Sequence, residues 1–269
     1  MARLDLVVLQ SASTHDKEAN LKSLRRLSSE IRSSPDIVVT PEYLMFDPTG
    51  LARDVVYRAA EDLEGQWSQE LSRMAERLGA CVLGHMFLRT SSGRVANAAV
   101  LYGKDGGIMG VYRKTHLFDA YGYKESSFTE PGDRLWRPLE ACGARIGVAI
   151  CYELRFPEVF RAQALNGGVD LFLVPAAWYK GPGKEEALSV LSRARAHENT
   201  SYVAVASNAG PNFVGRSMIV HPFGYTLAQA PPWEWVLEQE IDLSEVAKAR
   251  NSLPVLKHVK PQLYSYLPR

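Results

Sequence analysis

Apolar and polar residues alternate along the chain in a pattern that predicts strands and helices in turn. The apolar run at 4–9 indicates a strand, and the charged stretch 16–33 then places Leu21, Leu24 and Leu27 at helical spacing. Further strands are expected at 36–40, 80–87, 96–103, 108–113, 145–150, 170–174, 202–207, 217–221 and 235–241. Further helices are expected at 66–79, 154–166 and 184–198. The pattern therefore predicts an α/β fold.

The organisation of these elements favours one domain over residues 1–269. Polar and aromatic residues marked by glycine and proline predict a structured loop at 115–133. No low-complexity linker or block of like charge divides the sequence. Because the last strands follow one another without helices between them, we expect sheets of mixed strand direction.

Composition and charge exclude several classes of partner. The chain has 269 residues, of which 46% are hydrophobic and 23% charged, as in an ordinary globular protein. Lys plus Arg number 31 against 30 Asp plus Glu, so the net charge of +1 gives no electrostatic reason to expect nucleic acid or an anionic membrane as partner. No apolar run reaches the ~18 residues of a membrane span, and the N-terminal sequence does not resemble a signal peptide. We expect a cytoplasmic protein.

The three cysteines agree with this expectation. Cys81, Cys142 and Cys151 form an odd, sparse set, which is not a disulfide framework and lacks the paired spacing of a zinc site. We interpret Cys81 and Cys142 as small buried hydrophobic residues.

Cys151 has a different setting, because it ends the predicted strand 145–150 and precedes a helical stretch. The N-terminus of a helix carries partial positive charge, which favours the nucleophilic thiolate. The backbone N–H of Tyr152 is placed to donate to an oxyanion at the same point. A buried structural cysteine is the alternative interpretation.

Two further reactive residues also follow predicted strands, where sites gather in α/β folds. Glu42 lies beyond Pro41 among apolar and aromatic residues, a setting that could raise its pKa and suit a general base. Lys114 follows the strand 108–113, where it could donate to an oxyanion and steady a thiolate. Taken singly, each of these two residues is more often a solvated side chain without a catalytic role.

Taken together, the three residues resemble the Glu–Lys–Cys triad of the nitrilase superfamily, the carbon–nitrogen hydrolases. The matching motifs, in the family's order, are VVTPEY, YRKTHLFD and GVAICYELRFPE. KESSFTEPGD resembles the segment with the family's second glutamate, which would be Glu125. LVPAAW, RARAHEN and GRSMIVHPFG extend the resemblance over nearly the whole chain.

The resemblance implies an αββα sandwich of two mixed β-sheets flanked by helices. It also implies homodimers that pair through helices near the nucleophile and near RARAHEN. A C-terminal tail from about residue 250, including VLKHVKPQLY, would cross the dimer interface.

The implied activity is hydrolysis of the C–N bond of a small amide through a thioester on Cys151. Glu42 would act as general base, Lys114 would stabilise the oxyanion, and Glu125 would position Lys114 or the substrate. This scheme requires no metal and no cofactor. Hydrolysis of an N-carbamoyl amine or a nitrile on the same scaffold, and a non-catalytic interaction module, are the alternatives.

CYELRFPE resembles the Nit and ω-amidase branch, whose substrates are small carboxylate-bearing amides. Arg155 is then either the carboxylate anchor or a cation that packs against Glu153 or Glu158. Trp178 and Tyr179 form either the pocket wall or part of the core. The chain departs from this branch in two places. The segment 183–186 stands where a His–Trp pair is common, and His221 stands where an Asp is common.

Overall fold

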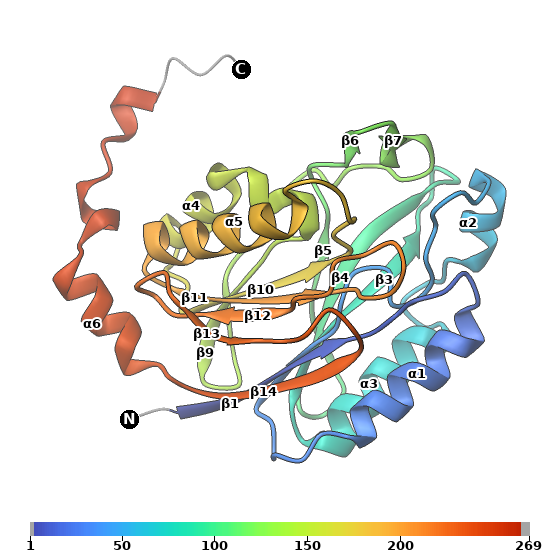
Figure 1. Ribbon diagram of the computed structural model, residues 1–269, viewed down its shortest axis with the longest axis horizontal. Coiled ribbons are helices and arrows are strands. Elements are labelled where there is room, and N and C mark those ends of the chain that lie inside the picture. Colours follow the sequence, from blue (N-terminus) through green and yellow to red (C-terminus); the bar gives the residue numbers. More distant parts are fainter. Residues whose placement is uncertain (1–2, 265–269) are drawn as a thin grey trace.

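The computed structural model describes residues 3–264, in which two six-stranded sheets face each other (Figure 1). The first sheet contains, in spatial order, β14 (Trp235–Asp242), β1 (Arg3–Gln10), β2 (Ile37–Val39), β3 (Cys81–Arg89), β4 (Val95–Tyr102) and β5 (Ile108–Arg113). The second contains β13 (Thr226–Gln229), β12 (Met218–Val220), β11 (Tyr202–Ser207), β10 (Leu171–Ala176), β9 (Ala144–Val148) and β8 (Leu139–Ala141).

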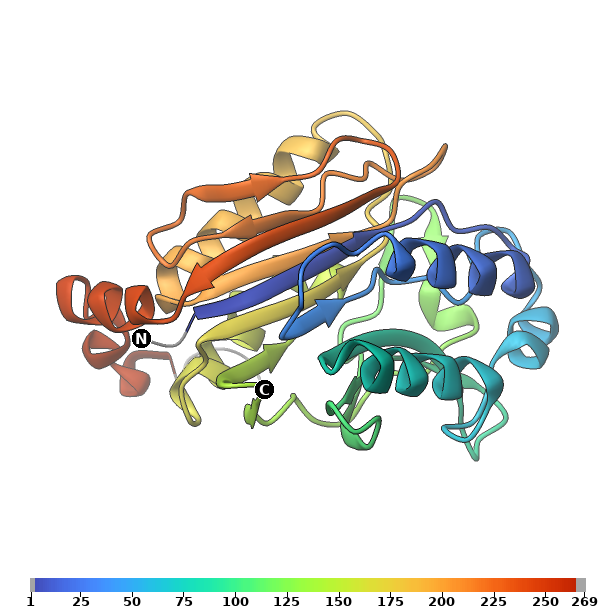
Figure 2. The same cartoon turned by 90° about the horizontal axis from the view of Figure 1, so that it is seen from below.

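Helices cover the outer face of each sheet. The helices α1 (Lys17–Ser29) and α3 (Gln66–Leu78) lie next to each other over the first sheet (Figure 2). Their counterparts α4 (Pro157–Leu165) and α5 (Lys184–Asn199) cover the second sheet. In α1, the leucines at helical spacing are buried against the sheet, as predicted. The predicted αββα sandwich is therefore confirmed.

Each sheet has a parallel centre and antiparallel flanks. In the first sheet β1, β2 and β3 are parallel, while β14, β4 and β5 join antiparallel. In the second sheet β9, β10 and β11 are parallel, while β8, β12 and β13 join antiparallel. The prediction of mixed sheets is confirmed. Antiparallel neighbours need only a short turn, whereas the parallel pairs need the intervening helices.

A disulfide between Cys81 and Cys142 contradicts the interpretation of these residues as free cysteines. Cys81 begins β3 in the first sheet, and Cys142 lies in the turn between β8 and β9 in the second. The two residues are 61 positions apart in sequence, but the facing sheets bring their Cα atoms to 6.2 Å. Sequence spacing alone does not show this proximity.

Several local elements differ from the predictions. The expected loop 115–133 contains the short hairpin β6 (Asp119–Ala120) and β7 (Tyr123–Lys124) and the 3₁₀ turn η1 (Glu125–Ser127). A helix α2 (Arg53–Ala59) also forms where none is predicted. The sequence did not indicate it because the helix buries one residue only, Val56, and so has no apolar periodicity.

The predicted helix 154–166 starts later than expected. Cys151 opens a 3₁₀ turn, η2 (Cys151–Arg155), and the α-helix begins at Pro157. Proline suits the first turn of a helix, where its missing N–H is not needed.

The C-terminal segment leaves the sandwich after β14 (Figure 1). It consists of α6 (Ser244–Ser252), η3 (Val255–His258) and η4 (Pro261–Tyr264), and the last two bury no residue. Residues 265–269, the end of the predicted tail, lie outside the described residues. Within 3–264, no helix combines the length and hydrophobicity that crossing a membrane requires.

Candidate active site

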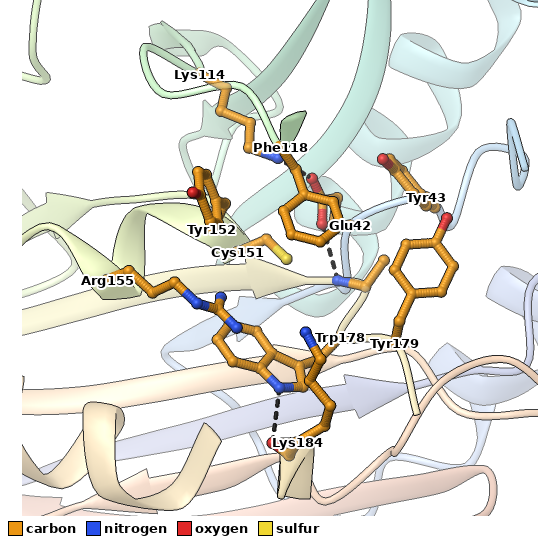
Figure 3. Close-up of a pocket in the computed structure, with 11 residues that line it drawn as sticks. Glu42, Tyr43, Lys114, Phe118, Cys151, Tyr152, Arg155, Trp178, Tyr179 and Lys184 are labelled. Carbon is orange, nitrogen blue, oxygen red and sulfur yellow. Dashed lines mark hydrogen bonds and ion pairs between the residues drawn. The ribbon is translucent and has the colours of Figure 1, made fainter. Parts of the chain in front are cut away.

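The structure brings the four predicted catalytic residues together between the two sheets. Lys114 Nζ lies 2.9 Å from Glu42 Oε1 and 2.9 Å from Glu125 Oε2. The Cys151 thiol lies close enough to Glu42 for the charge on that carboxylate to act on it. All four side chains are buried, and Cys151, Glu42 and Lys114 line one cavity (Figure 3). Glu42 follows β2, Lys114 follows β5 and Cys151 closely follows β9.

Two residues of the site have left-handed backbones. Cys151 has φ 47° and Tyr43, next to Glu42, has φ 64°. A residue other than glycine in this region costs ~1–3 kcal/mol, so the surrounding structure must hold it there. For Tyr43 a hydrogen bond does so, because its backbone N–H donates to His85 Nδ1 at 3.2 Å. Sequence reasoning did not anticipate either conformation.

Glu153 holds the turn that carries Cys151. Its fully buried carboxylate accepts hydrogen bonds from the N–H of Ile150 at 2.7 Å, the N–H of Thr115 at 2.9 Å and the Tyr112 hydroxyl at 2.7 Å. Burial acts to raise the pKa of Glu153, but its hydrogen bonds keep it below the ordinary value. The carboxylate therefore ties the nucleophile's turn to the segment that follows Lys114.

Asn97 is a site residue that sequence reasoning missed. Its Nδ2 donates to Glu42 Oε1 at 2.7 Å and to Glu125 Oε1 at 2.8 Å, so the amide bridges both carboxylates. Its Oδ1 lies 2.8 Å from His85 Nε2, which is the donor because His85 Nδ1 accepts the N–H of Tyr43. Burial lowers the pKa of His85 to about 4, so this imidazole is neutral at pH 7. The available signal was an asparagine inside the apolar strand β4.

The two buried glutamates differ in proton affinity. Burial is the largest influence on Glu42 and acts to raise its pKa, but the charge of Lys114 and the other favourable contacts of the carboxylate together outweigh it, so the pKa lies below the ordinary value. For Glu125, burial and the charge on Glu42 outweigh Lys114 and keep the pKa raised. The prediction of a raised pKa for Glu42 is therefore wrong, because the burial that motivated it is accompanied by a buried cation.

Burial also raises the pKa of the Cys151 thiol well above its ordinary value, and the charge on Glu42 adds to the effect. The predicted thiolate, favoured by a helix N-terminus, is therefore not the resting form. The α-helix starts six residues later, at Pro157, so its partial positive charge is not at Cys151. At neutral pH the resting pair is a protonated thiol beside an ionised carboxylate.

The four predicted substrate-binding residues line the same cavity as Cys151. These are Tyr152, Arg155, Trp178 and Tyr179. Trp178 is also buried against the core, and its Nε1 donates to the backbone carbonyl of Lys184 at 2.8 Å. Tyr179 is half-buried, and its hydroxyl lies 2.6 Å from Thr49 Oγ1. Both residues therefore form the pocket wall, and Trp178 belongs to the core as well.

Arg155 does not pair with either of the glutamates suggested for a packing role. The Glu153 carboxylate faces Ile150 and Thr115 instead, and among residues 3–264 no ion pair joins Arg155 to Glu158. The guanidinium carbon instead lies 4.0 Å from the centre of a Trp178 ring and 5.3 Å from that of Tyr152. The interpretation of Arg155 as a partner of these glutamates is wrong.

The carbon–nitrogen hydrolase family model matches residues 6–251 of this chain. The chain belongs to the carbon–nitrogen hydrolase family. This hydrolase is 35% identical to the deaminated glutathione amidase of Escherichia coli O157:H7 over 213 residues, which cover 78% of this chain and 80% of that protein. It is 32% identical to the omega-amidase NIT2 of Xenopus tropicalis, with 98% of each chain covered.

Solved structures support the same assignment. A carbon–nitrogen hydrolase superfamily protein from Xanthomonas campestris superimposes on this hydrolase with a TM-score of 0.87 and 27% identity, and all of both chains is covered. Family membership makes the protein a hydrolase of C–N bonds, and its named relatives act on amides as small-molecule substrates.

Proposed function

We propose that this hydrolase cleaves small amides with Cys151 as nucleophile, Glu42 as general base and acid, and Lys114 as oxyanion donor. The observation that carries the proposal is the buried contact network, in which Lys114 bridges Glu42 and Glu125 beside the Cys151 thiol. A buried cation between two carboxylates is costly unless the arrangement is held in place, and such perturbed groups cluster at functional sites.

The first step transfers the thiol proton to Glu42 as sulfur attacks the carbonyl carbon. The lowered pKa of Glu42 keeps its carboxylate ionised and able to accept, and the raised pKa of Cys151 keeps the proton on sulfur until attack. A C–S bond forms, and the carbonyl π electrons move to oxygen. Lys114 and the backbone N–H of Tyr152 donate to this oxyanion, which stabilises the tetrahedral intermediate.

The second step breaks the C–N bond. The oxyanion reforms the carbonyl, the nitrogen leaves with the bonding electrons, and Glu42 returns its proton to that nitrogen. Ammonia and a thioester on Cys151 result. Glu42 then accepts a proton from water as the water oxygen attacks the thioester. The C–S bond breaks, sulfur takes the proton back and the carboxylic acid departs. Covalent catalysis thus replaces one difficult displacement with two easier ones.

Glu125 acts through Lys114 in this scheme. It accepts from Lys114 Nζ and from the N–H of Phe118 at 2.7 Å, which fixes the carboxylate and directs the ammonium. Its other oxygen, Oε1, accepts from Asn97 Nδ2, and Glu125 does not line the cavity that contains the Cys151 thiol, whereas Glu42 does. We therefore assign Glu125 as a positioning residue.

The substrate that we propose is a small amide with a free carboxylate, held by Arg155. The guanidinium lies over a ring of Trp178 in the cavity that contains Cys151, and its donors are not engaged by a carboxylate of residues 3–264. A planar fork of donors matches a carboxylate. The relatives named omega-amidase and deaminated glutathione amidase support an amide substrate.

We further propose a homodimer that works in the cytoplasm. The support for a dimer is the family resemblance of the tail, where the described residues Leu263 and Tyr264 expose apolar surface. The expectation of a cytoplasmic protein drew partly on the cysteine content. The Cys81–Cys142 disulfide removes that support, because disulfides are rare in the cytosol. Sedimentation of the purified protein tests the assembly, and a monomer at micromolar concentration would contradict it.

Ammonia release across a substrate panel tests the activity. The panel contains dicarboxylate monoamides, neutral amides, N-carbamoyl amines and nitriles. We expect the highest kcat/KM on a monoamide, and a raised KM for that substrate in Arg155→Met with neutral amides spared. Preference for a carbamoyl amine or a nitrile would reassign the substrate class, and equal losses on charged and neutral amides would refute the anchor.

A further inference from the structure

A second cation, Lys184, lines the cavity that contains Cys151 and Arg155. It is the first residue of α5 and follows Gly183, whose positive φ of 67° turns the chain at this point. Figure 3 shows Arg155 and Lys184 both reaching toward Trp178 from different elements. The segment around Lys184 is also where the sequence departs from the ω-amidase branch.

Lys184 is held in place without being neutralised. Its Nζ lies 3.3 Å from the centre of the Tyr121 ring and 5.8 Å from that of Phe118. Within residues 3–264 no carboxylate forms an ion pair with Lys184 or with Arg155. Aromatic rings attract a cation but carry no net charge, so both groups keep their full positive charge for a ligand.

The acidic groups of the cavity do not compensate these charges. Glu42 is the carboxylate that lines it, and it already accepts from Lys114, Asn97 and the N–H of Ala177. Arg155 and Lys184 are therefore each free to pair with an anion from solution. A cavity lined by two such cations attracts a doubly charged substrate more than a singly charged one.

The cavity beside Cys151 is narrow. Its volume of about 20 Å³ is room for about one water molecule. Lys184 connects two segments beside the cavity. From the start of α5, its ammonium contacts the exposed Tyr121 in the turn between β6 and β7.

We propose that Lys184 is a second anion-binding residue, so that this pocket selects small amides with two carboxylates. Arg155 holds the carboxylate of the singly charged substrate, and Lys184 holds the additional one. This assignment rests on the proposed amidase function and adds a determinant of its substrate class.

Three amides of matched chain length test the proposal. They are valeramide, glutaramate and the terminal monoamide of tricarballylate, which carry zero, one and two carboxylates. Their binding is measured by calorimetry on the Cys151→Ala protein, which is expected not to turn them over. Lys184→Met in that background should weaken binding of the doubly charged amide at least about ten-fold, as for loss of a hydrogen bond to a charged group, and should leave the other two unchanged.

The matched control is Lys180→Met. Lys180 is an exposed neighbour whose Nζ donates to the Gly210 carbonyl at 2.8 Å, outside the cavity. The Lys180→Met substitution removes the same charge from the same region and should not change binding of the doubly charged amide. Lys184→Met should also fold, because the bond from Trp178 goes to the backbone carbonyl of Lys184, which the substitution keeps.

An unchanged dissociation constant for the doubly charged amide in Lys184→Met would overturn the proposal, as would an equal loss in Lys180→Met. Because binding is measured without turnover, this result is independent of the proposed reaction. Failure of the wild-type enzyme to release ammonia from any of the three amides would instead refute the proposed function.

Discussion

Asn97→Asp tests whether the bridging amide sets the protonation of the two glutamates. The substitution keeps the shape of the side chain but replaces a donor that lies 2.7 Å from Glu42 and 2.8 Å from Glu125 with a third carboxyl group. Each lost hydrogen bond to a charged group is worth roughly 1.5–3 kcal/mol. Two unit charges about 4 Å apart at an effective dielectric constant of about 20 repel by about 4 kcal/mol.

Repulsion of this size favours proton uptake by the cluster. The pKa of Glu42 is lowered in the wild-type protein, so its carboxylate is ionised at neutral pH. The wild-type enzyme should therefore lose activity only in acid, where Glu42 becomes protonated. In Asn97→Asp the pKa of Glu42 rises, so the acid limb of kcat/KM should move up by roughly one to three pH units. Activity that the variant loses in mild acid should return as the pH is raised.

The assay is ammonia release from an amide substrate as a function of pH, with circular dichroism to confirm folding. Asn20→Asp is the matched control, because Asn20 is also buried and its Nδ2 donates to the carbonyls of Thr14 and Met45, away from the site. It should lower stability without moving the acid limb. An acid limb in Asn97→Asp that coincides with the wild type, or one that moves equally in the control, would refute the reasoning.

Other predictions concern single groups. Glu42→Gln should lower kcat/KM by at least ~10²-fold, as for a lost general base, and Lys114→Met by ~10²–10³-fold, as for a lost oxyanion donor; a folded variant with a near-normal rate would remove that residue from the mechanism. Alkylation of Cys151 by iodoacetamide, followed by mass spectrometry, should be slow at neutral pH and accelerate in alkali because the thiol pKa is raised, whereas rapid labelling that does not depend on pH would indicate a resting thiolate. Reduction of the Cys81–Cys142 disulfide, which closes a 61-residue separation, should lower the free energy of unfolding by about 4 kcal/mol, and an unchanged melting temperature would contradict that estimate.

The sequence predicted the parts of the fold that depend on short-range pattern. The helix α1 has leucines at helical spacing, and the strands around β2 and β9 are continuous apolar runs, so each was placed within a few residues. The short helix α2 buries only Val56 and left no such pattern. The order and layering of the two sheets came from the family resemblance, because strand pairing is a long-range property that local periodicity does not contain.

The sequence indicated the four candidate catalytic residues but not the residue that connects them. Glu42, Lys114 and Cys151 were singled out because each follows a predicted strand, and the family resemblance made them candidate catalytic residues. Glu125 became a candidate through its motif alone. Asn97 could not be assigned, since its role depends on two carboxylates 55 and 28 positions away.

The pKa directions of Glu42 and Cys151 were wrong for a related reason. Proton affinity depends on the balance between burial and nearby charges, and the sequence did not show that Lys114 would be buried beside Glu42. The same limitation hid the disulfide, whose cysteines meet only when the sheets face each other.

The central claim is a thioester between the substrate's acyl group and Cys151, and trapping it tests that claim most directly. The wild-type enzyme is mixed with an amide that it hydrolyses, quenched in acid during turnover and digested for peptide mass spectrometry. We predict an increase in mass equal to the acyl group on the peptide that contains Cys151, which disappears when substrate is exhausted and is absent from Cys151→Ala. Turnover by purified Cys151→Ala, or acylation of a different residue, would contradict the account.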